Sequence, residues 1–272
     1  MPFSRTDLAA EWAARPDEAP EGVIHEAFCR HDVPIRRVEI CTEGASRFLG
    51  RPMGRYMTLE PRHFSSPVRN LKEEAAALAE ELRGLLPKEG AVLVVGLGNQ
   101  NITPDALGPA VARKIFVTRH LQGKVPGMTS LRSVSCIAPG VLGQTGLESA
   151  ELIRAAAETI HPAAVIAVDA LAAADPERLG KTVQLSDAGI VPGSGVANHR
   201  AGLTEGTLGM PVIAVGIPTV SEMPMGDGVM VVTPRTVDDV IRNASRLIGL
   251  GISMALQPAL SPDDLLQLTE DY

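Results

Sequence analysis

The sequence predicts an α/β fold, a single domain with a doubly wound, mostly parallel sheet and an irregular N-terminal β layer. Two observations carry this prediction. The chain of 272 residues is 45% hydrophobic, which is enough for a substantial core. From about residue 70 onward, apolar strand-like runs alternate with helical patterns, as in folds with helices on both faces of a sheet. We therefore divide the chain into an N-terminal segment and β layer, 1–69, and an α/β core, 70–272, within one domain.

The N-terminal segment is rich in Arg, Pro and Gly and carries two short β-like runs, at 38–41 and 55–58. It contains no motif that points to chemistry. Apolar residues then recur at helical spacing among Glu and Lys from Leu71 to Leu85, and Pro87 ends the pattern. This spacing predicts a surface helix that leads into the core.

The first core strand is predicted at 91–95, a continuous apolar run typical of a strand covered on both faces. A Gly-rich loop over 96–103 follows. Thr103 as N-cap and Pro104 at the first helical position then predict a helix that continues to about His120.

The middle of the core begins with a strand predicted at 133–137. A T-x-x-E pattern over 145–148 predicts a capping box for a helix that continues to about Ile160. The apolar run 164–168 is typical of a central strand, and it ends at Asp169.

The last part of the chain begins with a loop, 185–195, that is dense in Gly, Ser and Pro. It is either a substrate-binding loop with exposed N–H groups or a tight turn between strands. Two strands are predicted at 212–216 and 229–232, and a final amphipathic helix at 237–251.

Composition and charge exclude several classes of function. Lys and Arg number 25 against 32 Asp and Glu, so the chain lacks the basic surface that direct nucleic-acid binding needs. The longest apolar stretch, 91–98, is too short to cross a bilayer, and no signal-peptide pattern is present. The three cysteines form no CxxC pair, which suits a reducing compartment. We expect a cytoplasmic protein that binds neither membrane nor nucleic acid.

Two carboxylates form the candidate catalytic site. Asp105 follows the strand 91–95 through the Gly-rich loop, and Asp169 follows the strand 164–168 directly. Ligands of open α/β sheets bind at the carboxyl ends of parallel strands, so these side chains can face one another. Two adjacent carboxylates do not both ionise easily, and such a pair supplies an acid and a base for activating water and protonating a leaving amine. The alternative is structural, with Asp105 as a first-turn helix acid and Asp169 as a loop cap.

Other chemistries fit the sequence less well. The loop after the first core strand fails the GxGxxG fingerprint because Asn101 replaces the third glycine, and we expect no cofactor. Ser194 lies in a G-S-G triplet, but Pro192 occupies the first glycine position of a nucleophile elbow. His199, together with the two aspartates, would complete an O,O,N ligand set for a divalent metal, which stays open as an alternative.

Several motifs together resemble the germination (spore) protease family. They are G-L-G-N-Q-N-I-T-P-D-A-L-G-P at 96–109, V-D-A-L-A at 168–172, the loop 184–196, G-I-P-T-V at 216–220, R-T-D-L-A at 5–9 and V-T-P at 232–234. They occur in order along nearly the whole chain, and the motif around Asp105 is the most specific of them.

The resemblance implies a fold like that of hydrogenase-maturation proteases, and an endopeptidase that degrades small acid-soluble spore proteins at germination in the spore core or forespore. It also implies a homo-oligomer, made as a zymogen that processes its own N-terminus. The family's two proposed catalytic aspartates map onto Asp105 and Asp169. The substrate-binding or supporting residues expected beside them are Asn99, Asn101, Ser186, Asp187, Gly193 and Ser194.

Self-processing is expected close to Asp7, in a segment that is acidic, exposed and Pro-rich. The chain departs from the family between Val220 and Val229, where we expect other members to carry a longer insertion. Two other functions stay open. One is a metal-dependent maturation peptidase of the same fold that uses His199, and the other is an inactive relative that binds spore proteins without cutting them.

Overall fold

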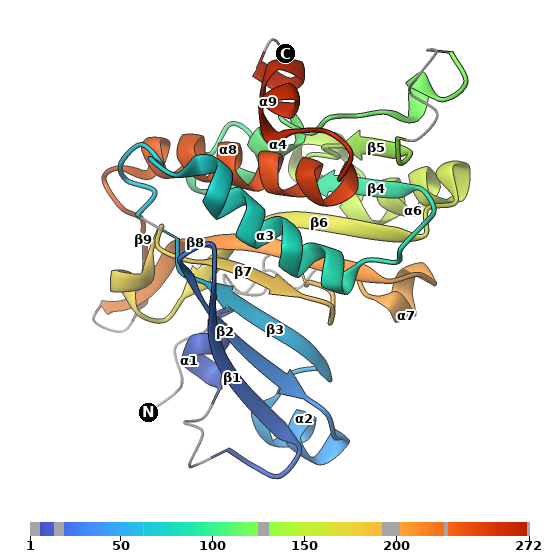
Figure 1. The fold of residues 1–272 in the computed structure, drawn as a ribbon. Coiled ribbons are helices and arrows are strands. Elements are labelled where there is room, and N and C mark those ends of the chain that lie inside the picture. Colours follow the sequence, from blue (N-terminus) through green and yellow to red (C-terminus); the bar gives the residue numbers. More distant parts are fainter. Residues whose placement is uncertain are drawn as a thin grey trace.

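The computed structural model describes residues 6–13, 19–61, 63–124, 131–191, 202–225 and 228–270, and they form one large sheet with helices on both faces (Figure 1). Within these ranges the sheet has nine strands in the order β1-β2-β3-β7-β8-β6-β4-β5, with β9 paired to β8. The strands are β1 (Val23–Arg30), β2 (Val33–Ile40), β3 (Gly54–Leu59), β4 (Val92–Gly96), β5 (Val134–Ile137), β6 (Ala164–Ala173), β7 (Val183–Ser186), β8 (Val212–Met225) and β9 (Gly228–Val232).

The helices range from single turns to the 20-residue α8. They are α1 (Ala9–Trp12), α2 (Glu43–Leu49), α3 (Leu71–Leu85), α4 (Leu107–Ala112), α5 (Leu142–Thr145), α6 (Ser149–Ile160), α7 (Glu205–Leu208), α8 (Val237–Leu256) and α9 (Pro262–Glu270), with 3-10 turns η1 (Thr103–Asp105), η2 (Arg119–Leu121) and η3 (Pro176–Arg178). None of the helices in the described ranges is both long and apolar enough to span a bilayer.

The predicted α/β class is confirmed. Strands β8, β6, β4 and β5 lie side by side and run parallel, and they form the centre of the fold. Beyond β8 the sheet continues through antiparallel pairs with β7 and β3, and β9 also pairs with β8 antiparallel. The sheet is therefore mixed, with its parallel strands between the two helical layers.

Strand β4 shows why the core strands are apolar throughout. Val92 and Val94 point into one cluster of buried side chains, which includes residues of α3, α4 and α8. Leu93 and Val95 point into a second cluster, which includes Ile153 of α6. Because successive strand residues face opposite sides, a strand between two helical layers needs apolar residues at every position.

The N-terminal β layer is more regular than the sequence predicts. Strands β1, β2 and β3 form an antiparallel meander, and β3 pairs with β7, so this layer continues the central sheet. Two arginines of the meander, Arg30 and Arg37, form ion pairs with Glu81 of α3, whose side chain is 3% exposed. The buried Glu81 carboxylate is thus paired, as burial requires, and the two ion pairs join the meander to the helical layer.

The predicted helix 104–120 is wrong. The chain forms only the turn η1 and the short helix α4, and it then continues without helix before η2. The N–H of Thr118 donates to the Val134 oxygen over 3.0 Å, and the Val134 N–H donates to Thr118 Oγ1 over 3.0 Å. Pairing with the start of β5 thus replaces the helical hydrogen bonds of this segment.

The predicted capping box at 145–148 is also wrong, although its helix exists. Residue Gly146, with φ of 72°, ends the short helix α5. The capping box of α6 is made one turn later, by Glu148 and Glu151. Glutamate can provide this box because its carboxylate accepts backbone N–H groups as a Ser or Thr hydroxyl does.

Several elements are longer than their apolar patterns predict. Strand β6 continues past Asp169 to Ala173, so Asp169 lies within the strand instead of after it. Strand β8 continues to Met225 and forms a hairpin with β9, and α8 continues to Leu256. The start of the predicted loop 185–195 belongs to strand β7, and α9 was not predicted.

Candidate active site

A glycine-rich turn at the carboxyl end of β4 brings α4 against β4 and β6. A Cβ on Gly108 would lie 2.2 Å from the Leu97 oxygen and 2.6 Å from the Val168 oxygen, and one on Gly96 would lie 2.2 Å from the Gly108 oxygen. A side chain at either position would therefore collide with backbone. The Leu97 N–H donates to the Val168 oxygen over 2.8 Å, which fastens this turn to β6.

The same turn holds Asp105, the last residue of η1. The Asn99 N–H donates to Asp105 Oδ2 over 2.7 Å. Gly98 adopts φ of 111°, and a Cβ there would lie 2.1 Å from the Asp105 backbone oxygen. From β8, Thr219 Oγ1 donates to the Pro104 oxygen over 2.7 Å. The glycine turn and β8 thus fix the position of Asp105 from two sides.

Asn99 and Asn101 shape this loop. Asn99 Oδ1 accepts from the Asn101 N–H over 3.0 Å and from Gln144 Nε2 over 2.7 Å. Neither asparagine is among the residues that line the cavity described below. Their position suits the supporting role that the sequence predicts, because they order the turn that carries Asp105.

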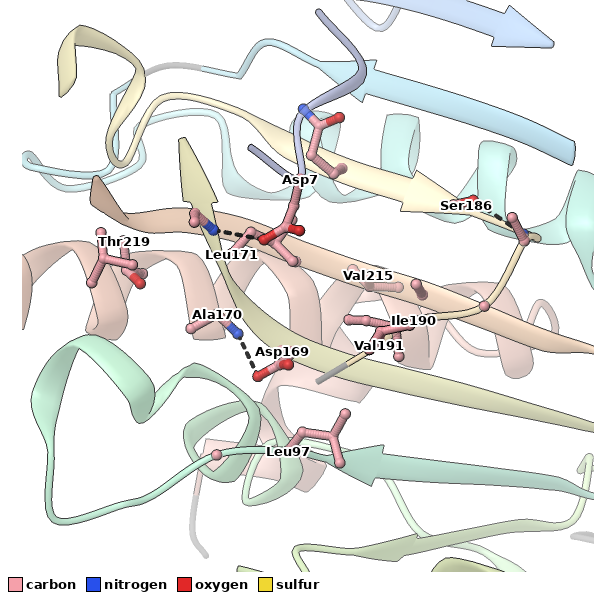
Figure 2. A pocket seen from close by; sticks show the side chains of 18 of the residues that line it. Asp7, Leu97, Asp169, Ala170, Leu171, Ser186, Ile190, Val191, Val215 and Thr219 are labelled. Atoms are coloured by element: carbon pink, nitrogen blue, oxygen red, sulfur yellow. Dashed lines mark hydrogen bonds between the residues drawn. The ribbon is translucent and has the colours of Figure 1, made fainter. Parts of the chain in front are cut away.

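Asp169 lies on β6 at the level where β4 ends. The pairing of β4 with β6 stops at Gly96 and Val168, so Asp169 is the first residue of β6 beyond it. The Asp169 side chain is buried, and its Oδ1 accepts from the Ala170 N–H over 2.9 Å (Figure 2). The sequence therefore finds the correct edge of the sheet for Asp169, even though the strand continues past it.

Asp105 and Asp169 line one cavity of about 590 Å³. Its walls are largely apolar, with Leu97, Leu171 and Ile190 among the lining residues. A largely apolar cavity of this size with a few polar groups is typical of a ligand-binding site. Carboxylates in such surroundings are candidates for acid and base chemistry.

A third carboxylate, Asp7, lines the same cavity. In Figure 2 the N-terminal segment brings Asp7 against β6, and Asp169 lies on β6 itself, closer to Leu97. The Asp7 N–H donates to the Ala172 oxygen over 3.0 Å, and the Ala172 N–H donates to Asp7 Oδ2 over 2.9 Å. The sequence predicts processing close to Asp7 but does not predict Asp7 as a residue of the site.

Leu8 and Ala9, directly after Asp7, are buried and residues 10–13 are half-buried, so the prediction of an exposed segment is wrong for these described residues. Leu8 is 0% exposed and packs in a cluster with Leu171 and Leu179. The Glu11 carboxylate accepts the N–H groups of Ala174 and Asp175 at the end of β6. The N-terminal segment is thus fastened along β6 by both apolar and polar contacts.

An aromatic contact anchors the end of α1. The ring of Trp12, the single tryptophan of the chain, meets the Tyr56 ring edge-on with centroids 4.9 Å apart. The Arg51 guanidinium lies 5.5 Å from the Trp12 ring centroid. Burial raises the pKa of the Tyr56 phenol, whose hydroxyl donates to the Pro52 oxygen over 2.7 Å. Tyr56 and Arg51 also line the cavity, so this contact forms part of its wall.

The two polar residues Ser186 and Asp187, predicted from the loop 185–195, have different surroundings. Ser186 is buried and lines the cavity, and its hydroxyl accepts from the Ala188 N–H over 3.1 Å. Asp187 is not among the lining residues, because its carboxylate pairs with Arg55 over 2.8 Å and also accepts the Arg55 N–H. Its side chain therefore holds the edge of the N-terminal meander.

Three other predicted residues, Gly193, Ser194 and His199, lie outside the described residues. Within the described ranges, no group of three His, Cys, Asp or Glu side chains comes together as metal ligands would. The metal alternative depends on His199 and stays a prediction.

Comparison with known proteins identifies the family. A family profile described as germination protease matches residues 5–223. The chain belongs to the germination protease family. A germination protease of Clostridium perfringens is 37% identical over 319 aligned positions that cover 96% of this chain and 97% of the relative. One from Bacillus subtilis is 38% identical, with 96% of this chain and 76% of the relative covered.

The alignment with the Clostridium perfringens protease has 319 positions, more than the 272 residues of this chain, so that relative carries residues that this chain lacks. Among solved structures, a [NiFe] hydrogenase maturation protease HycI from Thermococcus kodakarensis is similar at 18% identity with a TM-score of 0.40. The similarity covers 63% of this chain and 98% of that protein.

Proposed function

We propose that this germination protease is an endopeptidase that degrades small acid-soluble spore proteins during germination, and that Asp105 and Asp169 activate the attacking water. The observation that carries this proposal is that both carboxylates line one cavity at the carboxyl end of β4. The spore or forespore is then the place of action, and the chain acts there as a homo-oligomer.

The proposed reaction needs one ionised and one protonated carboxyl group. The ionised carboxylate removes a proton from water as the water oxygen attacks the peptide carbonyl carbon. The protonated carboxyl group then gives its proton to the leaving nitrogen as the C–N bond breaks. Two carboxylates in one largely apolar cavity support this division, because their mutual repulsion disfavours the doubly ionised state.

The test is cleavage of a purified small acid-soluble spore protein, followed by electrophoresis and mass spectrometry. Asp105→Asn and Asp169→Asn should each reduce cleavage to background, with melting temperatures that show a folded protein. Asp187→Asn is the matched control, since Asp187 directly follows the cavity residue Ser186 but pairs with Arg55 and does not line the cavity. It should cut the substrate at close to the normal rate.

Two outcomes would contradict the aspartate mechanism. One is substantial turnover by either folded aspartate variant. The other is cleavage that stops on addition of a chelator and returns with a divalent metal, which would favour the metal-dependent alternative through His199. Loss of metal in a His199→Ala variant would then identify the ligand.

Self-processing close to Asp7 is part of the same proposal. Since Leu8 is fully buried and Asp7 is bonded to Ala172, the N-terminal segment must detach from β6 before its peptide bonds can enter any active site. Intact mass, measured before and after acidification or drying, should show the loss of about six residues in the wild type but not in Asp169→Asn. An unchanged N-terminus in a protein that already cuts its substrate would contradict this part of the proposal.

A further inference from the structure

Strand β6 presents to the cavity an edge that no described strand covers, although the Ala170 N–H donates to Asp169 Oδ1. Its pairing with β4 ends at Val168, whereas its pairing with β8 on the other side continues to Ala173. Among the described strands, none pairs with β6 beyond Val168 on the β4 side. Residues 169–172 of this stretch all line the cavity. The cavity wall therefore contains a strip of strand backbone next to Asp169.

The N-terminal segment occupies part of this strip. The Asp7 N–H donates to the Ala172 oxygen, as the next strand of a sheet would. The other half of the pair differs, because the Ala172 N–H donates to the Asp7 side-chain carboxylate in place of a main-chain carbonyl. Among the described residues, a single main-chain hydrogen bond joins the Asp7 segment to β6, so this contact is weaker than a full ladder.

We propose that the protein substrate binds as an extended strand added to this edge of β6, over residues 170–172, and that it displaces the Asp7 segment. Backbone N–H and C=O groups on a strand edge pair most readily with another extended chain. A substrate main chain would offer the Ala172 N–H a main-chain carbonyl in place of the Asp7 side-chain carboxylate, and the apolar cavity walls would receive the substrate side chains.

The position of the strip agrees with cleavage by the aspartate pair. Ala172 is three residues from Asp169, which is about 10 Å at the rise of a strand. A strand paired at Ala172 and extended along β6 therefore passes Asp169 within a few residues. This inference rests on the proposed function for the identity of the substrate, but it concerns binding and can be measured without cleavage.

The first test is a backbone N-methyl scan of a ten-residue peptide. The peptide is the best binder from a set that tiles a purified small acid-soluble spore protein. Its dissociation constant is measured by fluorescence anisotropy on the Asp105→Asn variant, and its KM on the wild type. Strand addition predicts alternation: N-methylation at every second residue in the paired stretch should weaken binding at least tenfold, while the residues between should tolerate it.

The second test is Asp7→Ala, with Asp238→Ala as the control because Asp238 is an exposed acid on α8. Removing the acceptor of the Ala172 N–H should lower KM for the spore protein about fivefold, the typical effect of one hydrogen bond, with kcat unchanged. The control should change neither constant. A structural role alone would lower the melting temperature of Asp7→Ala without lowering KM.

The outcomes separate this inference from the proposed function. An alternating effect of N-methylation on binding, with no cleavage of the substrate, would support strand addition to β6 and contradict the proposed protease function. Cleavage of the substrate, with no alternating effect of N-methylation on Kd or KM, would contradict strand addition to β6 but not the proposed protease function. A KM that rises in Asp7→Ala would also contradict strand addition to β6, because Asp7 would then help to bind the substrate instead of competing with it.

Discussion

Adding one methyl group at Gly108 should disable the active site without touching either aspartate. In Gly108→Ala the new Cβ would lie 2.2 Å from the Leu97 oxygen, 2.3 Å from the Leu97 nitrogen and 2.6 Å from the Val168 oxygen. Non-bonded contacts of carbon need about 3.5 Å, so α4 must move away from β4 and β6 by about 1 Å. All three obstructing atoms belong to backbone, which cannot rotate aside as a side chain can.

The cost in stability follows from this geometry. Overpacking of a core costs about 1–3 kcal/mol, and the upper end applies here because no flexible group can yield. For a chain of this size about 3 kcal/mol corresponds to a melting temperature lower by roughly 6–12 °C. Since α4 directly follows the turn that carries Asp105, a displacement of about 1 Å should also lower kcat about 100-fold.

The matched control is Gly84→Ala on α3, where nothing lies within 4 Å of the added Cβ. Alanine should stabilise this helix by up to about 1 kcal/mol and leave cleavage unchanged. The assays are thermal unfolding followed by circular dichroism, and cleavage of a purified small acid-soluble spore protein. Equal melting temperatures and equal turnover in the two variants would refute the packing argument.

Three other substitutions test separate parts of the structure. Tyr56→Phe should lose about 1 kcal/mol of unfolding free energy at pH 8 with its hydrogen bond to Pro52. Because burial raises the Tyr56 pKa, the wild type should lose more stability than the variant as pH rises above about 10, and a constant difference between them in a denaturant series across pH would contradict this. Thr219→Val removes the donor to Pro104 and should lower kcat several-fold with little change in KM, whereas a pure KM effect would contradict a role in positioning Asp105. Asn243→Leu leaves two backbone oxygens of the segment before α3 without their donor and should cost about 1–3 kcal/mol in urea unfolding, with normal activity at low temperature.

The elements that sequence predicts well are those whose signal is local. The continuous apolar run of β4 and the helical spacing of α3 both appear in the structure almost as predicted. Asp105 could be placed at the cavity because its glycines and Pro104 form one contiguous motif. Each of these features depends on residues that are neighbours in the chain.

The failures come from contacts between distant residues. The sequence assigns the segment after α4 to a helix from the start signals at Thr103 and Pro104, but this segment pairs with β5 through Thr118 and Val134. Asp7 reaches the site by a hydrogen bond to Ala172, 165 residues away, which no local pattern can reveal. Asp187 lies in a Gly- and Ser-rich stretch that is typical of a substrate-binding loop, yet its carboxylate forms an ion pair with Arg55 of the N-terminal meander. In each of these three cases, a contact with a residue far away in the sequence determines the position of the segment or side chain.

The contact of Trp12 with Tyr56 and Arg51 gives the protein a built-in optical reporter. As the chain has one tryptophan, all indole emission comes from the end of α1, directly after the segment that pairs with β6. Detachment of that segment would expose the indole to water and shift its emission to longer wavelength. Stopped-flow mixing can therefore time the release of the N-terminal segment against the first appearance of product, in the unlabelled wild-type protein. Such a record would show whether the cavity opens before the substrate arrives or because of it.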